Sequence, residues 1–286
     1  MVKFSLILCT LNRVDEICDF FSSLENQSFK DFECIVVDQN DDDRLNVAIE
    51  HFQTKFPIKY IKSDKKGLSI SRNLGLTLVE GEIIAFPDDD CKYDVSTLKQ
   101  VTCFFDSNPK VDILTINFSD PDTGGCFNKC QQQKLLTRTS YYHYTISIGI
   151  FVKYKNISDL HFDEKLGVGC YFGSGEESDF VSNLLSIGYS ACYDGGICIF
   201  HSLAVPQTNI ESRSMKYNLG YGALMRKEIC SRHKYVFMYS FCYGILIRLV
   251  AALLPLKKRK LYYYSFKYRI LGFIRYGSLY NADKAK

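Results

Sequence analysis

The first 118 residues alternate between short apolar runs and amphipathic runs, and this alternation restricts the folds open to the chain. The apolar runs are continuous rather than alternating, so we expect strands that are buried on both faces. Strands that alternate with helices predict a parallel sheet covered by helices on both sides. The strands are expected at 3–9, 32–40, 58–62, 82–86 and 111–118, and the helices at 14–27, 44–52, 68–81 and 95–105.

The region from 119 to 205 is less regular. It begins with turn residues at 119–130 and continues with a run typical of a strand at 141–151. The segment 173–189 predicts an amphipathic helix whose first turn is acidic, as the helix dipole favours. Short strands are expected at 189–193 and 197–201.

Charge divides the chain into two parts. Residues 1–205 carry 19 Lys and Arg against 29 Asp and Glu, whereas residues 206–286 carry 16 against 3. A basic segment suits an anionic surface, either a membrane or a nucleic acid. Because the larger part is acidic, we expect an anionic membrane surface and no nucleic acid as the partner.

The basic part contains an apolar run at 235–256, interrupted by Arg248 and followed by Lys-Lys-Arg-Lys at 257–260. The length permits a membrane-spanning helix. An arginine in the middle of a span costs ~2.5–3.5 kcal/mol on translocon scales, so the sequence favours a helix in the plane of the membrane surface. A spanning helix and a helical cap on the soluble core are the alternatives.

The first thirteen residues hold too few apolar residues for a signal peptide and are expected to form the first buried strand. Without an export signal, the twelve cysteines are expected to be reduced thiols in the cytosol. Cys126 and Cys130 have no partner pair at the spacing of a zinc site.

Polar side chains follow three of the predicted strands. Thr10, Asn12 and Arg13 follow the first strand, Asp38 ends the second, and Asp88–Asp90 follow the fourth. In parallel sheets, ligands bind beyond the carboxyl ends of the strands, so these groups are expected to share one crevice.

The first strand is not followed by a glycine-rich phosphate loop, which argues against a dinucleotide-binding fold. An acidic crevice needs a cation to hold a diphosphate, and Mg²⁺ or Mn²⁺ is held by one or two carboxylates plus substrate phosphates. The alternative for Asp88–Asp90 is a solvated turn in which Asp90 caps the next helix.

Five segments together resemble the inverting family 2 glycosyltransferases of the GT-A fold. The resemblance covers roughly residues 3–205, and it implies a Rossmann-like, mostly parallel sheet flanked by helices, here with a C-terminal basic, aromatic helical extension. Under it, residues 1–118 form the nucleotide-sugar half, 119–205 the acceptor and catalytic half of the same domain, and 206–286 the membrane-associating extension. The segments are SLILCTLNR, SLENQSFKDFECIVVDQN, GLSISRNLGL, GEIIAFPDDD and FDEKLGVGCYFGSGEESDF.

The resemblance also assigns roles to residues. Thr10 and Asp38 match positions that contact the nucleotide base, and Arg72 matches an arginine near the diphosphate. Asp88 would face the ribose and join the metal site, with Asp89 supporting it. Asn12 and Arg13 would complete the donor site.

By the same resemblance, Asp90 would bind the metal ion, and His201 matches a further metal ligand of some members. Glu177 takes the position of the catalytic base. The family often has Glu-Asp where this chain has Glu176-Glu177, so Glu176 and Asp179 remain alternatives for that role. An ordinary acidic first turn is the structural alternative for both glutamates.

The resemblance implies a metal-dependent inverting transfer from a nucleotide-sugar to a hydroxyl group, and the basic C-terminal part favours a glycan or lipid-linked acceptor in cell-surface polysaccharide synthesis. UDP is the expected nucleotide, with dTDP and GDP as alternatives. The expected location is cytoplasmic, peripheral on the inner face of the cell membrane. The alternative function is a non-catalytic, membrane-attached nucleotide-sugar-binding or scaffold protein. A nucleotidyltransferase would need a phosphate loop near the first strand, which this sequence lacks.

Overall fold

The computed structural model describes residues 2–202 and 210–284, and the chain forms two compact units. Unit 1 comprises Met1–Phe162 and Phe180–Ala204, and unit 2 comprises Asp163–Asp179 and Val205–Lys286. The segment 163–179 therefore groups with the C-terminal helices and not with the sheet that precedes and follows it. The boundary expected between residues 205 and 206 lies outside the described residues.

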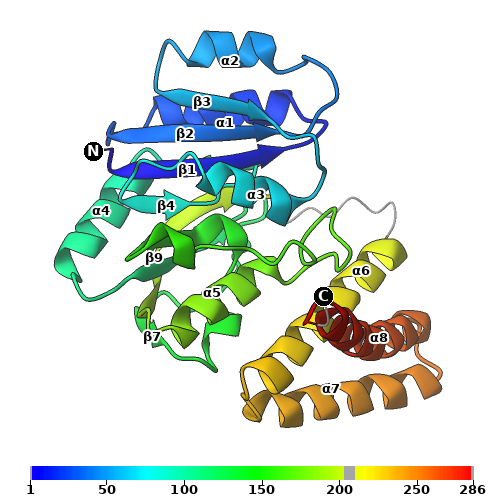
Figure 1. The fold of residues 1–286 in the computed structure, drawn as a ribbon. Helices are drawn as coiled ribbons and strands as arrows, with labels where there is room; N and C mark the ends of the chain where they lie inside the picture. Colours follow the sequence, from blue (N-terminus) through cyan, green and yellow to red (C-terminus); the bar gives the residue numbers. More distant parts are fainter. Residues whose placement is uncertain (1, 203–209, 285–286) are drawn as a thin grey trace. The chain divides into compact units, whose positions relative to one another are not determined.

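Unit 1 is built on a nine-stranded sheet with the order β3-β2-β1-β4-β8-β6-β9-β5, and β7 also pairs with β9 (Figure 1). The strands β3, β2, β1 and β4 run parallel, as the sequence pattern predicts. The strands are β1 (Phe4–Thr10), β2 (Phe32–Asp38), β3 (Ile58–Lys62), β4 (Ile83–Ala85), β5 (Cys91–Tyr93), β6 (Ile113–Ser119), β7 (Lys134–Leu136), β8 (Ile150–Lys153) and β9 (Ala191–His201).

The second half of the sheet is mixed, because β8 lies antiparallel between β4 and β6. The prediction of a strand at 141–151 is wrong for most of that segment. Tyr141–His143 and Ser147–Gly149 form 3₁₀ turns, and β8 begins only at Ile150. The run lacks strict alternation, so its aromatic and β-branched residues suggested a strand that the backbone does not form.

The two short strands predicted at 189–193 and 197–201 are one strand, β9. Its register against β6 shifts between Ile116 and Asn117, which pair with Asp194 and Cys198. Gly195 and Gly196 lie in this bulge, and a Cβ atom at Gly195 would be 2.0 Å from the carbonyl oxygen of Cys130. In the sequence this glycine pair resembles a turn, whereas in the fold it allows a close backbone approach.

Helices cover both faces of the parallel half. Phe20, Phe21 and Leu98 join the cluster formed by one face of β1 and β2, whereas Gly75 lies against Ile7 on the other face. The predicted helix 68–81 ends early, at Leu76, and beyond it the N–H of Gly81 donates to Ser5 Oγ of β1. The helices of unit 1 are α1 (Asp15–Glu25), α2 (Asn46–Phe52), α3 (Leu68–Leu76), α4 (Thr97–Ser107) and α5 (Glu176–Ser186), whose first turn belongs to unit 2.

Unit 2 contains the predicted C-terminal helical extension. Helices α6 and α8 pack closely, since a Cβ atom at Gly222 would lie 2.1 Å from the carbonyl oxygen of Arg269 and one at Gly272 would lie 2.0 Å from that of Leu219. Glycines at both contacts let the two backbones meet. The elements are α6 (Ile210–Arg226), the π-helical turn η4 (Lys227–Ser231), α7 (Val236–Leu253) and α8 (Arg259–Lys284).

Candidate functional site

The three predicted strand ends meet at one edge of the sheet. β1 pairs with β2 so that Thr10 is opposite Asp38, and Cys9 forms a parallel bridge with Asp88 just beyond β4. We expected these residues to share a crevice because the strands before them were predicted to run parallel. β1, β2 and β4 do run parallel. Unit 1 therefore brings Thr10, Asp38 and the three aspartates to the same carboxyl edge.

Arg13 links two of the three aspartates. Its Nη1 atom lies 2.6 Å from Asp89 Oδ1 and 2.5 Å from Asp90 Oδ2. Thr10 Oγ1 donates a hydrogen bond of 2.7 Å to the other oxygen of Asp89. Burial raises the pKa of Asp89, although Thr10 and Arg13 both act to lower it. The guanidinium of Arg13 therefore offsets the repulsion between the adjacent carboxylates of Asp89 and Asp90.

His201 lies beside Asp90, with Nε2 3.3 Å from Asp90 Oδ1. The pairing of β5 with β9 places His201 opposite Cys91, directly after the aspartates. Burial acts to raise the pKa of Asp90, but hydrogen bonds from His201 and Arg13 outweigh it and hold that pKa at about 2. The hydrogen bond to Asp90 raises the pKa of His201, while burial acts in the opposite direction.

Asp88 and Arg72 form a third charged pair at this edge. Arg72 Nη2 lies 3.2 Å from Asp88 Oδ1 and also donates to Ser147 Oγ. The Arg72 side chain is only 1% exposed. Its guanidinium lies over the rings of Phe86 and Phe162, at 5.8 and 5.3 Å from their centroids. Arg72 is therefore a buried support of Asp88 rather than a surface arginine.

The donor types at this edge suit a hard divalent cation. Within residues 2–202 and 210–284, no group of three or more His, Cys, Asp or Glu side chains is arranged to hold a metal ion. Asp90 and His201 supply two adjacent donors, and Asp88 is about one-third exposed beside them. Mg²⁺ and Mn²⁺ sites often need one or two carboxylates from the protein and take further ligands from substrate phosphates and water. Asp90, His201 and Asp88 therefore have the donor types that would hold such a cation. A bound diphosphate would supply further ligands.

Asp38 lies at the end of β2 and is fully buried. Its Oδ1 atom accepts hydrogen bonds from the backbone and side chain of Asn40, and its Oδ2 atom accepts one of 2.7 Å from Tyr60. Asn12 adopts a left-handed conformation (φ 63°) in which its N–H donates to Asn40 Oδ1. Asn40 lies at the end of the second predicted strand and was expected at this edge, whereas nothing in the sequence pointed to Tyr60, which lies in the middle of β3.

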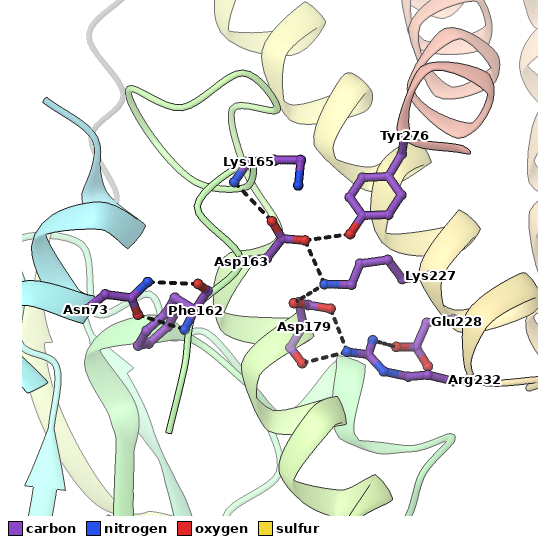
Figure 2. Close-up of polar contacts among 9 residues, drawn as sticks. All are labelled: Asn73, Phe162, Asp163, Lys165, Asp179, Lys227, Glu228, Arg232 and Tyr276. Atoms are coloured by element: carbon purple, nitrogen blue, oxygen red, sulfur yellow. Dashed lines mark hydrogen bonds and ion pairs between the residues drawn. The ribbon is translucent and has the colours of Figure 1, made fainter. Parts of the chain in front are cut away.

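The three candidates for the base lie at the start of α5, in unit 2. Glu176 is the first helical residue and is buried, and Glu177 follows it half-buried. Asp179 is buried, with Lys227 Nζ 2.6 Å from Oδ2 and Arg232 Nη2 2.7 Å from Oδ1 (Figure 2). Sequence reasoning missed Lys227 and Arg232, because basic residues in a basic helical region carry no signal of a buried partner.

Comparison with known proteins identifies a family. A model of glycosyl transferase family 2 matches residues 5–166. The minor teichoic acid biosynthesis protein GgaB of Bacillus subtilis is 28% identical over 194 residues, which are 64% of this chain and 21% of GgaB. Poly(ribitol-phosphate) β-N-acetylglucosaminyltransferase TarS of Staphylococcus aureus is 32% identical over 120 residues, 41% of this chain and 21% of TarS. The chain thus aligns with about one-fifth of the length of these relatives.

Solved structures show the same fold. TarS residues 1–349 in complex with UDP-GlcNAc superpose with a TM-score of 0.65 at 19% identity, covering 98% of this chain and 92% of that one. The mannosyltransferase PcManGT of Pyrobaculum calidifontis, in complex with GDP-Man and Mn²⁺, also has a TM-score of 0.65, at 14% identity. It covers 96% of this chain and 87% of its own. The expected GT-A fold is confirmed.

Proposed function

Because this chain belongs to glycosyl transferase family 2, we propose that it transfers a sugar from a nucleotide-sugar to a hydroxyl group of a glycan or lipid-linked acceptor, with inversion at the anomeric carbon. Two of the relatives are a teichoic acid biosynthesis protein and a poly(ribitol-phosphate) glycosyltransferase. They support an acceptor that takes part in cell-surface polysaccharide synthesis.

A UDP-sugar is the proposed donor. The observation that carries the donor site is the cluster of Arg13, Asp89, Asp90 and His201 at the carboxyl edge of the sheet. The TarS structure contains UDP-GlcNAc, whereas PcManGT contains GDP-Man with Mn²⁺, so GDP is the competing nucleotide. Thr10, Asn12 and Asp38 would form the nucleotide side of the site, and Arg72 would orient Asp88 toward the ribose.

Asp90 and His201, with Asp88, would hold Mg²⁺ or Mn²⁺. A bound cation would supply Lewis-acid stabilisation of the negative charge that develops on the departing nucleotide diphosphate. Asp90 suits this role because the same contacts that lower its pKa keep its carboxylate ionised at neutral pH. His201 remains beside it as a neutral or charged partner according to pH.

The oxygen of the acceptor hydroxyl would form a bond to the anomeric carbon of the sugar while the bond from that carbon to the nucleotide diphosphate breaks. Glu177 or Glu176 would accept the proton that the hydroxyl loses. A carboxylate in the first turn of a helix is stabilised in its charged form by the helix dipole. Asp179 is a poorer candidate, because Lys227 and Arg232 engage both of its oxygens in a buried setting. A positioned base contributes typically ~10²–10⁴-fold to the rate.

The C-terminal helices are proposed to rest on the cytoplasmic face of the membrane. Val236–Leu253 is a helix of sufficient length and apolarity to cross a membrane, and most of its side chains are exposed. Arg248 donates to Ser265 and to the carbonyl oxygen of Gly244, so it is held within unit 2. α7 exposes apolar side chains, including Leu246, Ile247 and Leu253, and Lys257–Lys260 follow as exposed cations, so this part of unit 2 suits contact with an anionic membrane surface.

Calorimetric titration of UDP, with and without Mn²⁺, tests the donor site. We expect metal-dependent binding by the wild-type protein and its loss in Asp90→Ala. Asp41→Ala is the matched control, because Asp41 is an exposed aspartate paired with Lys66. If UDP, dTDP and GDP all fail to bind in the presence of Mn²⁺, the transferase proposal is wrong.

Turnover separates the enzyme from the alternative. A nucleotide-sugar-binding scaffold protein would bind UDP with Mn²⁺ but would not release UDP from any UDP-sugar in the presence of acceptor. Release of UDP that depends on an added glycan or lipid-linked acceptor would establish the transferase.

A further inference from the structure

The segment that carries the proposed base is held by the C-terminal helices of its own unit. Asp163 and Asp179 stand at its two ends, and Lys227 Nζ reaches both carboxylates, at 2.8 Å from Asp163 Oδ2 and 2.6 Å from Asp179 Oδ2 (Figure 2). One ammonium group in the turn η4 thus ties the beginning of the segment to its end.

Further contacts surround this lysine. Tyr276 of α8 donates a hydrogen bond of 2.6 Å to Asp163 Oδ2, the same oxygen that Lys227 contacts. Arg232 spans Asp179 and Glu228, with Nη2 2.7 Å from Asp179 Oδ1 and Nη1 2.5 Å from Glu228 Oε1. Both Asp179 and Glu228 are buried, so these ion pairs are shielded from solvent and their geometry is restricted.

The residues just before the base are also fixed to α6. A Cβ atom at Gly220 would lie 2.3 Å from the carbonyl oxygen of Ser174, and Ser174 Oγ donates to the carbonyl oxygen of Tyr217. Gly175 has a φ of 91°, a left-handed conformation that directs the chain into α5. The backbone on the N-terminal side of Glu176 is therefore held by α6, and the turn on its C-terminal side by Lys227 and Arg232.

We propose that Lys227 and Arg232 are positioning residues that fix the first turn of α5, and with it the carboxylates of Glu176 and Glu177, for proton transfer. This inference rests on the proposed function, because it assigns the base to those glutamates. It makes the C-terminal helices part of the catalytic apparatus in addition to any role at the membrane. Lys227 and Glu228 lie in the π-helical turn η4 and Arg232 follows it directly, so the three side chains of this network come from one short segment.

The test compares full-length Lys227→Met with wild type in three measurements. We expect kcat for transfer to fall about 10²-fold, since a displacement of about 1 Å at a reacting group has an effect of that size. The KM for the donor and the affinity for UDP with Mn²⁺ should not change. Hydrogen–deuterium exchange of the amides of residues 176–180 should accelerate. Lys227→Arg, which keeps the cation, should recover much of kcat.

Two further variants distinguish a loss of positioning from unfolding of the protein. Tyr276→Phe removes one hydroxyl contact with Asp163 and should also lower kcat, but by less than Lys227→Met does. Arg213→Met is the control, because Arg213 is an exposed cation on α6 that stacks on Tyr217. It should leave kcat and exchange unchanged.

The inference is overturned if folded Lys227→Met keeps wild-type kcat or wild-type exchange at residues 176–180. It is also overturned if kcat and UDP affinity fall together, which would indicate a general loss of structure. A wild-type protein that binds UDP but transfers to no acceptor would instead refute the proposed function. In that case the exchange measurement still decides whether Lys227 fixes the first turn.

Discussion

Each of the three adjacent aspartates has a cationic partner. Asp88 pairs with Arg72, Asp89 with Arg13, and Asp90 with both Arg13 and His201. The sequence alone placed these residues at one edge of a sheet, because strand ends can be read from apolar runs. It could not assign the pairs, since Arg13 and Arg72 are distant from the aspartates in sequence and their side-chain directions depend on the folded sheet.

Of the three carboxylates proposed as the base, Asp179 is already engaged by Lys227 and Arg232, which leaves Glu176 and Glu177 as the candidates to test. Glu177→Gln or Glu176→Gln should lower kcat by ~10²–10⁴-fold, because the amide cannot accept the acceptor proton. UDP affinity measured by calorimetry should stay at the wild-type value in both variants. The variant with the larger loss of kcat identifies the base, and wild-type kcat in both would remove the role from this pair.

Asp163 gives the stability of unit 2 a dependence on pH. Burial acts to raise its pKa, but Lys227 and Tyr276 outweigh this effect and lower the pKa from 3.8 to about 2. The folded state is therefore stabilised by Asp163 at pH values above about 4, by roughly 2 kcal/mol. This contribution disappears as the pH falls from about 4 toward 2.

Urea unfolding of wild type and Asp163→Asn, followed by circular dichroism, checks this dependence. The difference between the two proteins in free energy of unfolding should be greatest above about pH 4 and should shrink toward pH 2. A difference that is independent of pH over this range would assign the effect to packing instead of charge.

At the level of elements, the parallel half of the sheet was predictable and the mixed half was not. Strands β1 to β4 alternate with helices whose buried faces follow a helical period, so local pattern and fold agree. β8 inserts between β4 and β6, although both neighbours are distant from it in sequence. Such pairing depends on long-range packing, which a single sequence does not display. The helix expected at 173–189, by contrast, was predicted from its acidic first turn and apolar face, and it is present as the shorter α5, Glu176–Ser186.

The contact between α6 and α8 depends on glycine. Gly222→Ala would place a methyl group 2.1 Å from the carbonyl oxygen of Arg269, so we expect a loss of roughly 1–3 kcal/mol in the free energy of unfolding. Gly244→Ala is the matched control on α7, because its Cβ would meet Arg248 Nη1 at 3.4 Å. There, higher helix propensity should leave stability equal or slightly increased. Equal melting temperatures for both variants would contradict the close contact.

For the whole molecule, charge is divided along the chain. The first 205 residues are acidic and hold the candidate donor site, while the C-terminal helices present apolar and cationic side chains. Sequence composition revealed this division. It did not reveal that the segment 163–179 joins the C-terminal unit, because that grouping depends on contacts between residues distant in sequence.

Vesicle co-sedimentation tests the membrane proposal. Replacing the four cations of 257–260 by Gln should weaken binding to vesicles that contain phosphatidylserine by about 1 kcal/mol per charge, and binding should fall as salt rises. A control protein replaces four exposed lysines of unit 1 and should bind like wild type. These lysines are Lys30, Lys55, Lys99 and Lys110. Equal binding of all three proteins would exclude the basic segment as the lipid contact.

The hydrogen bond between Asp163 and Tyr276 spans 113 residues of the chain. During protein synthesis, at about 5–20 residues per second, the ribosome makes Tyr276 roughly 5–20 s after Asp163. Lys227 and Arg232 are made earlier within that interval, and the set of partners around Asp163 and Asp179 is complete only once Tyr276 has been made. A nascent chain can therefore complete the strands of the parallel half before it can assemble the segment 163–179, which carries the proposed base, so any transferase activity would depend on synthesis of the last helix.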